Sequence, residues 1–276
     1  YQPLCNEFMA PETTGPQTYY PLRLSYCPDC SLVQLDYVIP TSLTFGDQYT
    51  YLTGSSPSLV DYYSRMAQEM VDRFQLKSGD AVVEIGSNDG TFLNAFKSLG
   101  ICALGVEGAR KPADIALSSG VPTLVRFFGK GAVQEIRNAL PANSNIRLII
   151  GMNVLAHTDN INEFLEETNK LMETDTVFIS QSHWLAALVR KFEFDTIYHE
   201  HLRYYTLASL SQMYQRHGLS INDAETTDFY GGSILAYAKE STGTDSVGIE
   251  SDNLKSILVD EAKIDVVKSL RDMKQV

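Results

Sequence analysis

The chain has 276 residues, of which 44% are hydrophobic and 20% are charged, and its formal net charge is -12. This length and composition exclude a disordered chain and allow one large domain, or two smaller ones, with a sizeable core. The acidic balance without clustered lysines and arginines argues against a surface that binds nucleic acid, because phosphate contacts need such clusters.

The sequence has no apolar run of about 18 residues or more and no basic and then apolar N-terminus. We therefore expect no transmembrane helix, no signal peptide and a cytoplasmic protein. Cys102 opens a predicted strand that should be buried, and the cysteines do not form a dense framework. Disulfides are therefore not expected, which fits a reducing compartment.

Residues 1–57 are predicted to form a small loop-and-ribbon module, because prolines are frequent in the first half and helical periodicity is lacking. The turn from Cys27 to Cys30 has the C-x-x-C spacing that brings two thiolates to one edge of a tetrahedral zinc site. Cys5 is the nearest further thiol, and no histidine precedes His157. Two unliganded thiols are therefore an equally good interpretation.

Tyr49 and Tyr51 come next, ahead of an amphipathic helix predicted at 58–74. Alternation in an extended segment would put both rings on one side, where they could line a sugar or carbonyl pocket. Packing of one or both rings against the core is an equally good interpretation.

The segment 81–96 reads as a strand, a turn-rich loop and a helix. Gly86 and Gly90 let the backbone approach a ligand closely, and the helix start offers N–H groups to it. A dinucleotide fingerprint would have glycine where Asn88 stands, which disfavours an NAD-dependent oxidoreductase. The spacing from Glu84, E-x-G-x-x-x-G, resembles motif I of class I S-adenosylmethionine-dependent methyltransferases, with an ordinary strand–helix–strand unit as the alternative.

Other candidates follow the next three strands. A carboxylate at the strand tip, as at Glu107, can accept hydrogen bonds from both ribose hydroxyls, which together with the glycine loop indicates adenosine. Phe127 and Phe128 follow the third strand, and we take Phe128 as the candidate contact to adenine, although both rings could equally belong to the core. Asn153 and His157 follow the fourth strand and are expected beside the methyl donor.

Strands and helices alternate from residue 80 onward, which predicts an α/β fold with a parallel, doubly wound sheet and ligands at the carboxyl ends of its strands. A helix at 207–217 and two strands in hairpin order then predict an antiparallel sheet edge. The predicted strands are 81–85, 102–107, 122–126, 147–152, 175–181, 219–224 and 234–238, and the helices between the first five are 90–99, 110–119, 130–139 and 161–172.

The densest chemical cluster is Tyr-His-Glu-His at 198–201, which offers an acid, a base and hydrogen-bond donors together. On an extended segment His199 and His201 would share a face, so a metal pair is one alternative. No H-E-x-x-H spacing supports a catalytic zinc. A polar interdomain linker is another alternative.

Residues 58–240 are predicted to form the cofactor-binding domain. Residues 241–276 are predicted to begin a further domain, because the composition turns polar before a final amphipathic helix near Leu254. The chain opens on Tyr1 without a methionine and closes at Val276 within a helical pattern, so we expect both ends to be cut.

Four segments, taken together, resemble the sugar C-methyltransferase family, whose members methylate C-3 of nucleotide-linked 4-keto deoxysugars. The resemblance implies a class I methyltransferase Rossmann-like fold, a zinc-ribbon-like N-terminal module with four cysteines, and a C-terminal Rossmann-like domain that helps bind the nucleotide sugar. Here the first cysteine pair has no counterpart and the C-terminal domain is represented by its opening helix, so we expect both to be incomplete. The four segments are 27–34, 84–90, 153–157 and 195–201.

The resemblance also implies roles for single residues in the reaction. His201 would be the base that removes the C-3 proton, and Glu200 and Tyr198 would orient it or the sugar. His157 would hydrogen-bond the developing enolate oxygen. The same role is implied for one of two aromatic residues, Tyr49 or Tyr51.

The implied cofactor is S-adenosylmethionine, or S-adenosylhomocysteine after transfer, and the partner is a nucleotide-sugar substrate taken by a monomer or homodimer. The alternatives are an O- or N-methyltransferase acting on another small metabolite, or a fold that binds S-adenosylmethionine or a nucleotide sugar without chemistry. Cofactor contacts are expected from Glu84, Gly86, Asn88, Gly90, Glu107, Phe128 and Asn153, and metal contacts from Cys27 and Cys30.

Overall fold

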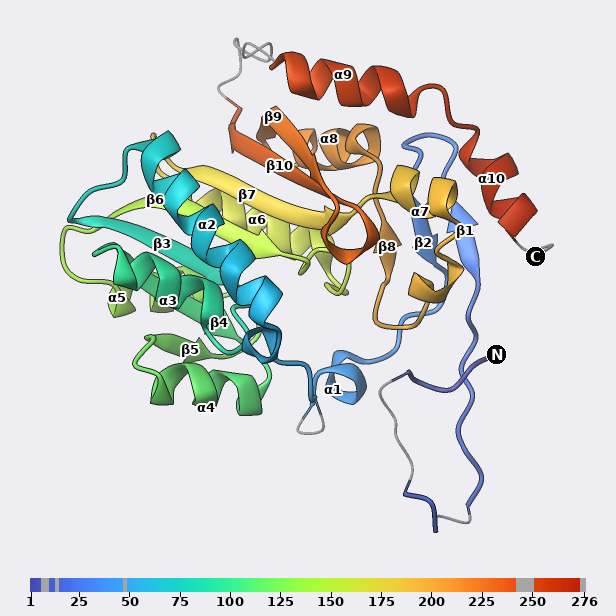
Figure 1. Ribbon diagram of the computed structural model, residues 1–276, viewed down its shortest axis with the longest axis horizontal. Coiled ribbons are helices and arrows are strands. Elements are labelled where there is room, and N and C mark those ends of the chain that lie inside the picture. The colour runs from blue at the N-terminus through green and yellow to red at the C-terminus, as the bar shows by residue number, and fades with distance from the viewer. Residues whose placement is uncertain (6–9, 13–14, 47–48, 242–250, 274–276) are drawn as a thin grey trace.

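The computed structural model describes residues 1–5, 10–12, 15–46, 49–241 and 251–273. A seven-stranded sheet forms its centre (Figure 1). In spatial order the strands are β5 (Thr123–Val125), β4 (Cys102–Glu107), β3 (Asp80–Ile85), β6 (Asn145–Met152), β7 (Val177–His183), β10 (Ser233–Glu240) and β9 (Leu219–Thr227).

The first five of these strands are parallel, and β10 pairs antiparallel with both β7 and β9. The predicted doubly wound sheet with an antiparallel edge is confirmed. The path of the chain reverses at β3, which lies between β4 and β6. In open α/β sheets, ligands bind in the crevice outside the carboxyl ends of the strands at such a reversal.

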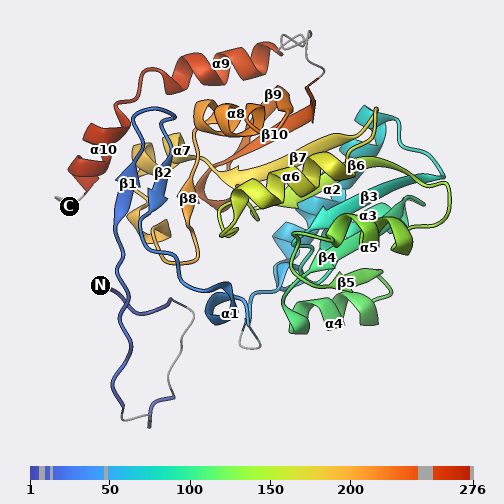
Figure 2. The same ribbon diagram turned by 180° about the vertical axis from the view of Figure 1, so that it is seen from behind.

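Helices cover both faces of the sheet, as Figures 1 and 2 show from opposite sides. All six residues of β3 are buried, which is typical of a strand covered on both faces. Val82 packs into one core, and Val83 into the other. The first core lies under α2 (Pro57–Phe74), α3 (Thr91–Ser98) and α4 (Arg110–Ser118), and the second under α5 (Ala132–Ala139), α6 (Ile161–Leu171) and α8 (Leu207–Gln215).

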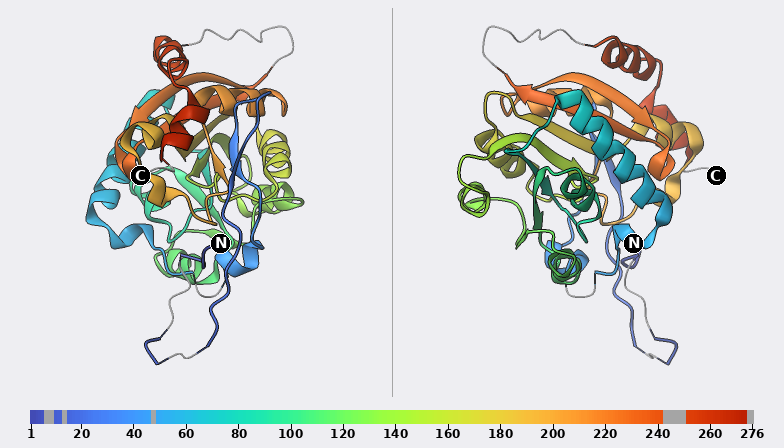
Figure 3. Two further views of the ribbon diagram at one scale, coloured as in Figure 1. Left: turned by 90° about the vertical axis from the view of Figure 1, so that its right-hand side faces the viewer. Right: turned by 60° about the vertical axis from the view of Figure 1, so that its left-hand side comes forward.

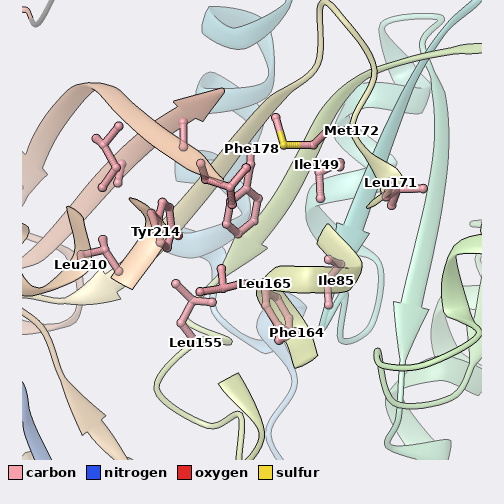
Figure 4. Packing of buried hydrophobic residues seen from close by; sticks show 14 of the residues in the cluster. Ile85, Ile149, Leu155, Phe164, Leu165, Leu171, Met172, Phe178, Leu210 and Tyr214 are labelled. Carbon is pink, nitrogen blue, oxygen red and sulfur yellow. The ribbon is translucent and has the colours of Figure 1, made fainter. Parts of the chain in front are cut away.

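The second core is dominated by aromatic and branched side chains (Figure 4). Phe178 of β7 stacks on Tyr214 of α8 at 5.5 Å between ring centroids. The hydroxyl of Tyr214 donates a hydrogen bond to Ser180 at 2.7 Å, so this fully buried phenol is satisfied. This packing fixes β7, whose carboxyl end reaches the site described below.

A second, three-stranded antiparallel sheet joins the N-terminal module to the rest of the chain. Its strands are β1 (Leu24–Tyr26), β2 (Val33–Leu35) and the distant β8 (Arg203–Tyr204), and a short helix, α1 (Thr41–Thr44), follows β2. Because β8 comes from the region predicted as the central domain, pairing with β2 carries the residues just before it against the N-terminal module.

Of the two C-terminal helices (Figure 3), α9 (Asp252–Glu261) packs on β9 and α8, and α10 (Val266–Met273) packs on α7 (Leu185–Lys191). Met273 of α10 shares a core with Val33 of β2 and with Leu188 of α7. Glu261 accepts hydrogen bonds from the indole of Trp184 and from the amide of Leu207, both at 2.6 Å. The boundaries 1–57, 58–240 and 241–276 stay a prediction, and the stretch 242–250 between the last two lies outside the described residues.

None of the helices in the described part of the chain combines the length and apolarity that a bilayer crossing requires. All four cysteines are free thiols, and Cys102 is half-buried at the start of β4.

Candidate active site

A cavity of about 790 Å³ lies at the carboxyl ends of β3, β4 and β6, where the path of the chain reverses. This volume is within the range of small-molecule sites, about 300–1,000 Å³. Most of its walls come from parts of the chain that are far apart in sequence: the stretch 41–53, the loops after β3, β4 and β5, the segment after β6, and the turn at 195–201.

The loop after β3 follows the glycine prediction in part. Gly86 lines the cavity with φ +69°, and a Cβ there would come within 3.0 Å of Val154. Gly90 is not among the lining residues. A Cβ at Gly90 would lie 3.0 Å from the Cβ of Ala116, so this glycine permits close packing at the start of α3, and its contact with the cofactor stays a prediction.

The predicted cofactor contact of Glu84 stays a prediction. Glu84 is buried within β3 and is not among the lining residues, and its Oε2 has no hydrogen-bond partner among the described residues. Burial, together with the negative charges of Glu107 and Asp89, raises the pKa of Glu84 well above its ordinary value. Glu84 therefore lies behind the glycine loop as a buried carboxyl.

Glu107 ends β4, lines the cavity and connects two loops. Its Oε2 accepts from the amide of Asn88 at 2.8 Å, and its Oε1 accepts from the amide of Ala109 at 2.7 Å. Burial raises the pKa of Glu107, and these amide hydrogen bonds act in the opposite direction. Each carboxylate oxygen keeps a further lone pair, so the group can still accept hydrogen bonds from a ligand.

Phe127 and Phe128 both line the cavity. The ring of Phe128 packs edge-on against Phe164, with 5.1 Å between centroids. The ring of Phe127 covers Gly108, where a Cβ would come within 2.3 Å of it, and its residue is 51% exposed. Phe127 therefore lies against the residue that follows Glu107, and the predicted contact of Phe128 with adenine stays a prediction.

The loop after β3 also forms hydrogen bonds with the segment that contains Tyr49 and Tyr51. The side chain of Asn88 accepts from the amide of Thr53 at 2.9 Å and donates to the carbonyl of Tyr51 at 3.1 Å. Asp89 accepts from the amide of Gly54 at 2.8 Å. The side chain of Asn88 thus connects the loop after β3 to the segment 51–53, and Asn88 also lines the cavity.

Tyr49 and Tyr51 both line the cavity. Burial raises the pKa of both phenols above the ordinary value, so both remain protonated donors. The hydroxyl of Tyr51 lies 3.2 Å from that of Tyr230, a lining residue that the sequence reasoning missed. Tyr230 has φ +56°, a left-handed conformation that is rare for a bulky side chain.

The segment after β6 brings Asn153 and His157 to the cavity. Asn153 has φ +56°, and its amide donates to the carbonyl of Gln181 at 2.9 Å. Nδ1 of His157 lies 2.8 Å from the carbonyl oxygen of Glu200. Since a carbonyl only accepts, this nitrogen carries the proton and Nε2 is left with a lone pair. Burial lowers the pKa of His157 to about 4.

His201 has the same tautomer. Its Nδ1 lies 2.7 Å from the carbonyl oxygen of Thr196 and donates to it, and its Nε2 accepts from the hydroxyl of Tyr198 at 2.9 Å. The ring centroids of His201 and His157 are 5.0 Å apart. Burial, with a smaller effect from His157, lowers the pKa of His201 to about 3, so the imidazole is neutral at physiological pH.

Glu200 lines the same wall and is 7% exposed. Burial is the main cause of the raised pKa of Tyr198, and the negative charge of Glu200 adds to it. The thiol of Cys5 lies 3.8 Å from Oε1 of Glu200, a weak hydrogen bond at the rim of the cavity. Cys5, the third thiol considered for zinc, is therefore at the cavity.

His199 does not share a face with His201. It is 2% exposed, and its Nε2 contacts the carbonyl of Pro21 in the N-terminal module at 3.2 Å. The reason is that 198–201 forms a turn, closed by a bond from the amide of His201 to the carbonyl of Tyr198, so strand alternation does not apply. The described residues contain no group of three or more Cys, His, Asp and Glu placed to hold a metal ion.

Cys27 and Cys30 lie in the turn between β1 and β2, where the amide of Ser31 donates to the carbonyl of Cys27 at 2.9 Å. Hydrogen bonds from Cys30 lower the pKa of the Cys27 thiol, which favours the thiolate that metals bind. The turn therefore fits one half of a tetrahedral zinc site. The described residues do not supply the other half.

His183, at the carboxyl end of β7, is another cavity residue that the sequence reasoning missed. Its Nε2 lies 3.3 Å from Oε2 of Glu193, and its ring centroid is 6.3 Å from that of His201. Its position just after the predicted strand 175–181 could have indicated a cavity residue, because the carboxyl ends of strands line such crevices.

Comparison with known proteins decides the family. Residues 59–223 match the family model Methyltransf_23, described as "Methyltransferase domain". The chain belongs to the S-adenosylmethionine-dependent methyltransferases. Residues 1–45 of this methyltransferase match the model Methyltransf_13, described as "Putative zinc binding domain".

Among curated proteins, the methyltransferase is 34% identical over 237 residues to C-methyltransferase NovU of Streptomyces niveus. The match covers 86% of this chain and 56% of NovU, so the chain spans just over half the length of that relative. Two solved structures share the fold: the PH0226 protein of Pyrococcus horikoshii OT3 (TM-score 0.52, 11% identity, 70% of this chain and 95% of that one) and the CcbJ methyltransferase of Streptomyces caelestis (0.50, 13%, 65% and 89%).

Proposed function

We propose that this methyltransferase transfers a methyl group to C-3 of a nucleotide-linked 4-keto deoxysugar. The observation that carries the proposal is the neutral imidazole of His201, whose Nε2 has a lone pair for a proton and which lines one cavity with Gly86 and Glu107. The name of NovU, a C-methyltransferase, and the resemblance of the 195–201 segment to sugar C-methyltransferases support it.

Carbon methylation needs a base in addition to the methyl donor. A ketone at C-4 acidifies the proton on C-3, and we assign its removal to Nε2 of His201. The low pKa of this buried imidazole keeps it unprotonated, so it is available at physiological pH. The substrate would displace the Tyr198 hydroxyl from Nε2, and the bond from Nδ1 to Thr196 would hold the ring in place.

The cofactor, when bound, supplies an electrophilic methyl group on a sulfonium. We assign its adenosine half to the end of the cavity at Glu107, whose oxygens would accept from the ribose hydroxyls, with Phe127 or Phe128 against the adenine ring. Gly86 would allow close approach of the loop. Asn153, across the crevice, would complete this wall.

The enolate oxygen needs a hydrogen-bond donor in the transition state. The donor role that the resemblance implied for His157 conflicts with its geometry, since its one proton is on Nδ1 and is donated to Glu200. We therefore assign His157 as an acceptor for a sugar hydroxyl, through Nε2. Tyr49 or Tyr51 remains a candidate donor, because both phenols stay protonated.

The test uses a nucleotide-linked 4-keto deoxysugar that carries deuterium at C-3. Base-assisted carbon methylation predicts that deuterium is lost from C-3 in step with methyl transfer. Transfer to an oxygen or nitrogen, as in the alternative function, would retain the label at C-3. Methylated product that keeps its deuterium would therefore contradict the proposal.

A further inference from the structure

The pairing of His183 with Glu193 has no role in the reaction assigned above. Both histidines of that reaction donate their only proton to a backbone carbonyl, His157 to Glu200 and His201 to Thr196. In the neutral form each presents a lone pair to the cavity and no donor. A reaction that passes through an enolate also needs a hydrogen-bond donor directed at the carbonyl oxygen.

His183 differs from these two rings in its partner. Its Nε2 faces the carboxylate of Glu193, which only accepts when ionised, so this nitrogen carries a proton. Within the described part of the chain, Nδ1 of His183 makes no hydrogen bond. Because Nε2 donates to a carboxylate, the ring can take a second proton on Nδ1 and still form a neutral pair with Glu193, whereas His157 and His201 donate to uncharged carbonyls.

Glu193 is itself fixed in place. It packs on Gly231, where a Cβ would come within 2.5 Å of its carboxylate. Its carbonyl accepts from the hydroxyl of Thr196, the residue whose own carbonyl holds His201. One short segment, 193–196, therefore orients both His183 and His201.

The distance between the two rings matches the reaction. A base and a donor each approach their reacting atoms to about 3 Å, so groups about 6 Å apart can serve neighbouring atoms of one substrate. The centroids of His183 and His201 are 6.3 Å apart, and the rings are nearly perpendicular. The hydroxyl of Tyr51 is already engaged with that of Tyr230.

We infer that His183, paired with Glu193, donates a hydrogen bond from Nδ1 to the C-4 carbonyl oxygen of the substrate and stabilises the enolate that forms when His201 removes the C-3 proton. The inference rests on the proposed function. The proton moves from C-3 to Nε2 of His201, and His183 lends a hydrogen bond without giving up its proton, so the ketone reforms when the carbon takes the methyl group.

The test measures enolate formation without methyl transfer. A nucleoside-diphosphate-linked 4-keto deoxysugar is incubated in D₂O with the protein and S-adenosylhomocysteine, and deuterium entry at C-3 is followed by NMR. His183→Phe removes the donor, Glu193→Gln removes its carboxylate partner, and His217→Phe is the matched control, because His217 is bound to Asn162 outside the cavity. Calorimetric binding of S-adenosylhomocysteine checks that each variant is folded.

We expect exchange and kcat to fall about 100-fold in His183→Phe and by a smaller factor in Glu193→Gln, with cofactor affinity unchanged, because the loss of one oxyanion donor costs about 10²–10³ in rate. Exchange in a folded His183→Phe protein at the wild-type rate would overturn the inference while leaving the proposed function intact. Loss of exchange in Tyr49→Phe but not in His183→Phe would assign the donor to Tyr49. A wild-type protein that shows no exchange would contradict the proposed function itself.

Discussion

The hydroxyl of Tyr198 lies 2.9 Å from Nε2 of His201, and Nδ1 of the same ring lies 2.7 Å from the carbonyl oxygen of Thr196. A carbonyl accepts and does not donate, so the two contacts fix the tautomer and the orientation of the imidazole together. In the proposed reaction this ring is a pre-oriented base.

Replacing His201, the proposed base, should affect methyl transfer and leave cofactor binding unaffected. His201→Asn should lower kcat by about 10²-fold or more, the usual contribution of a positioned base. The affinity for S-adenosylmethionine should be nearly unchanged, because the assigned cofactor contacts are elsewhere in the cavity. Steady-state kinetics and calorimetry measure the two effects, with His217→Asn as a control. Retained turnover per bound complex would argue against this base.

Glu107→Ala should have the reverse effect. It removes a carboxylate assigned to the ribose and frees the amides of Asn88 and Ala109. Hydrogen bonds to a charged group contribute about 1.5–3 kcal/mol each, so the dissociation constant for S-adenosylmethionine should rise at least tenfold. Glu69→Ala, an exposed carboxylate on α2, is the control. Equal affinities of the two variants, measured by calorimetry, would be inconsistent with the assignment.

The hydrogen bonds between Asn88 and the segment 51–53 should contribute measurably to the stability of this part of the protein. Asn88→Ala removes two hydrogen bonds and should lower the free energy of unfolding by about 1–3 kcal/mol. Hydrogen exchange at the amides of 51–54 should rise more than elsewhere. Asn94→Ala, exposed on α3, should change neither quantity. Uniform protection in both variants would show that the segment is held by other contacts.

The two buried imidazoles should make stability depend on pH. The folded-state pKa is about 4 for His157 and about 3 for His201, against an ordinary value of 6.5. Between these values the unfolded chain binds more protons than the folded one, so the free energy of unfolding should fall as pH drops from about 6.5 toward 4.

Urea unfolding at about pH 7.5 and about pH 5.5 measures this dependence. The folded carboxyls with raised pKa, Glu84 and Glu107, act in the opposite direction, but they are common to wild type and variant. His201→Asn should therefore lose less stability on acidification than wild type. An equal loss in both proteins would mean that His201 stays accessible to protons in the folded state.

The zinc prediction depends on Cys27 and Cys30. The turn that holds them lowers the pKa of Cys27, so Cys27→Ser should reduce zinc per chain as measured by elemental analysis. Cys102→Ser, a half-buried thiol in β4, should leave the metal content unchanged. Equal zinc in both variants would place the metal, if bound, at another site.

Much of the site was predictable because strand ends meet at one edge of a parallel sheet. That rule brought Glu107, Asn153 and His157 to one cavity from the sequence alone. That rule does not say what the residues inside the motif contact. Gly90 and Glu84 have the expected spacing, but Gly90 serves helix packing and Glu84 is buried behind the loop.

Contacts between distant segments were not predictable from local pattern. Nothing near Asn88 indicates that its side chain binds a segment 35 residues earlier, and the pairing of β8 with β2 depends on the complete fold. The alternative that pairs His199 with His201 assumed an extended segment, and this segment turns. The role of His183 required a partner, Glu193, that lies beyond the end of α7.

The central claim is that the methyl group is transferred to carbon in a reaction that His201 starts as a base. The most direct measurement supplies S-adenosylmethionine with a ¹³C-labelled methyl group and a nucleotide-linked 4-keto deoxysugar, and assigns the product by carbon NMR. We expect one labelled methyl bonded to C-3 with wild-type protein and none with His201→Asn. A labelled methyl on oxygen or nitrogen, or equal product from the two proteins, would contradict the account.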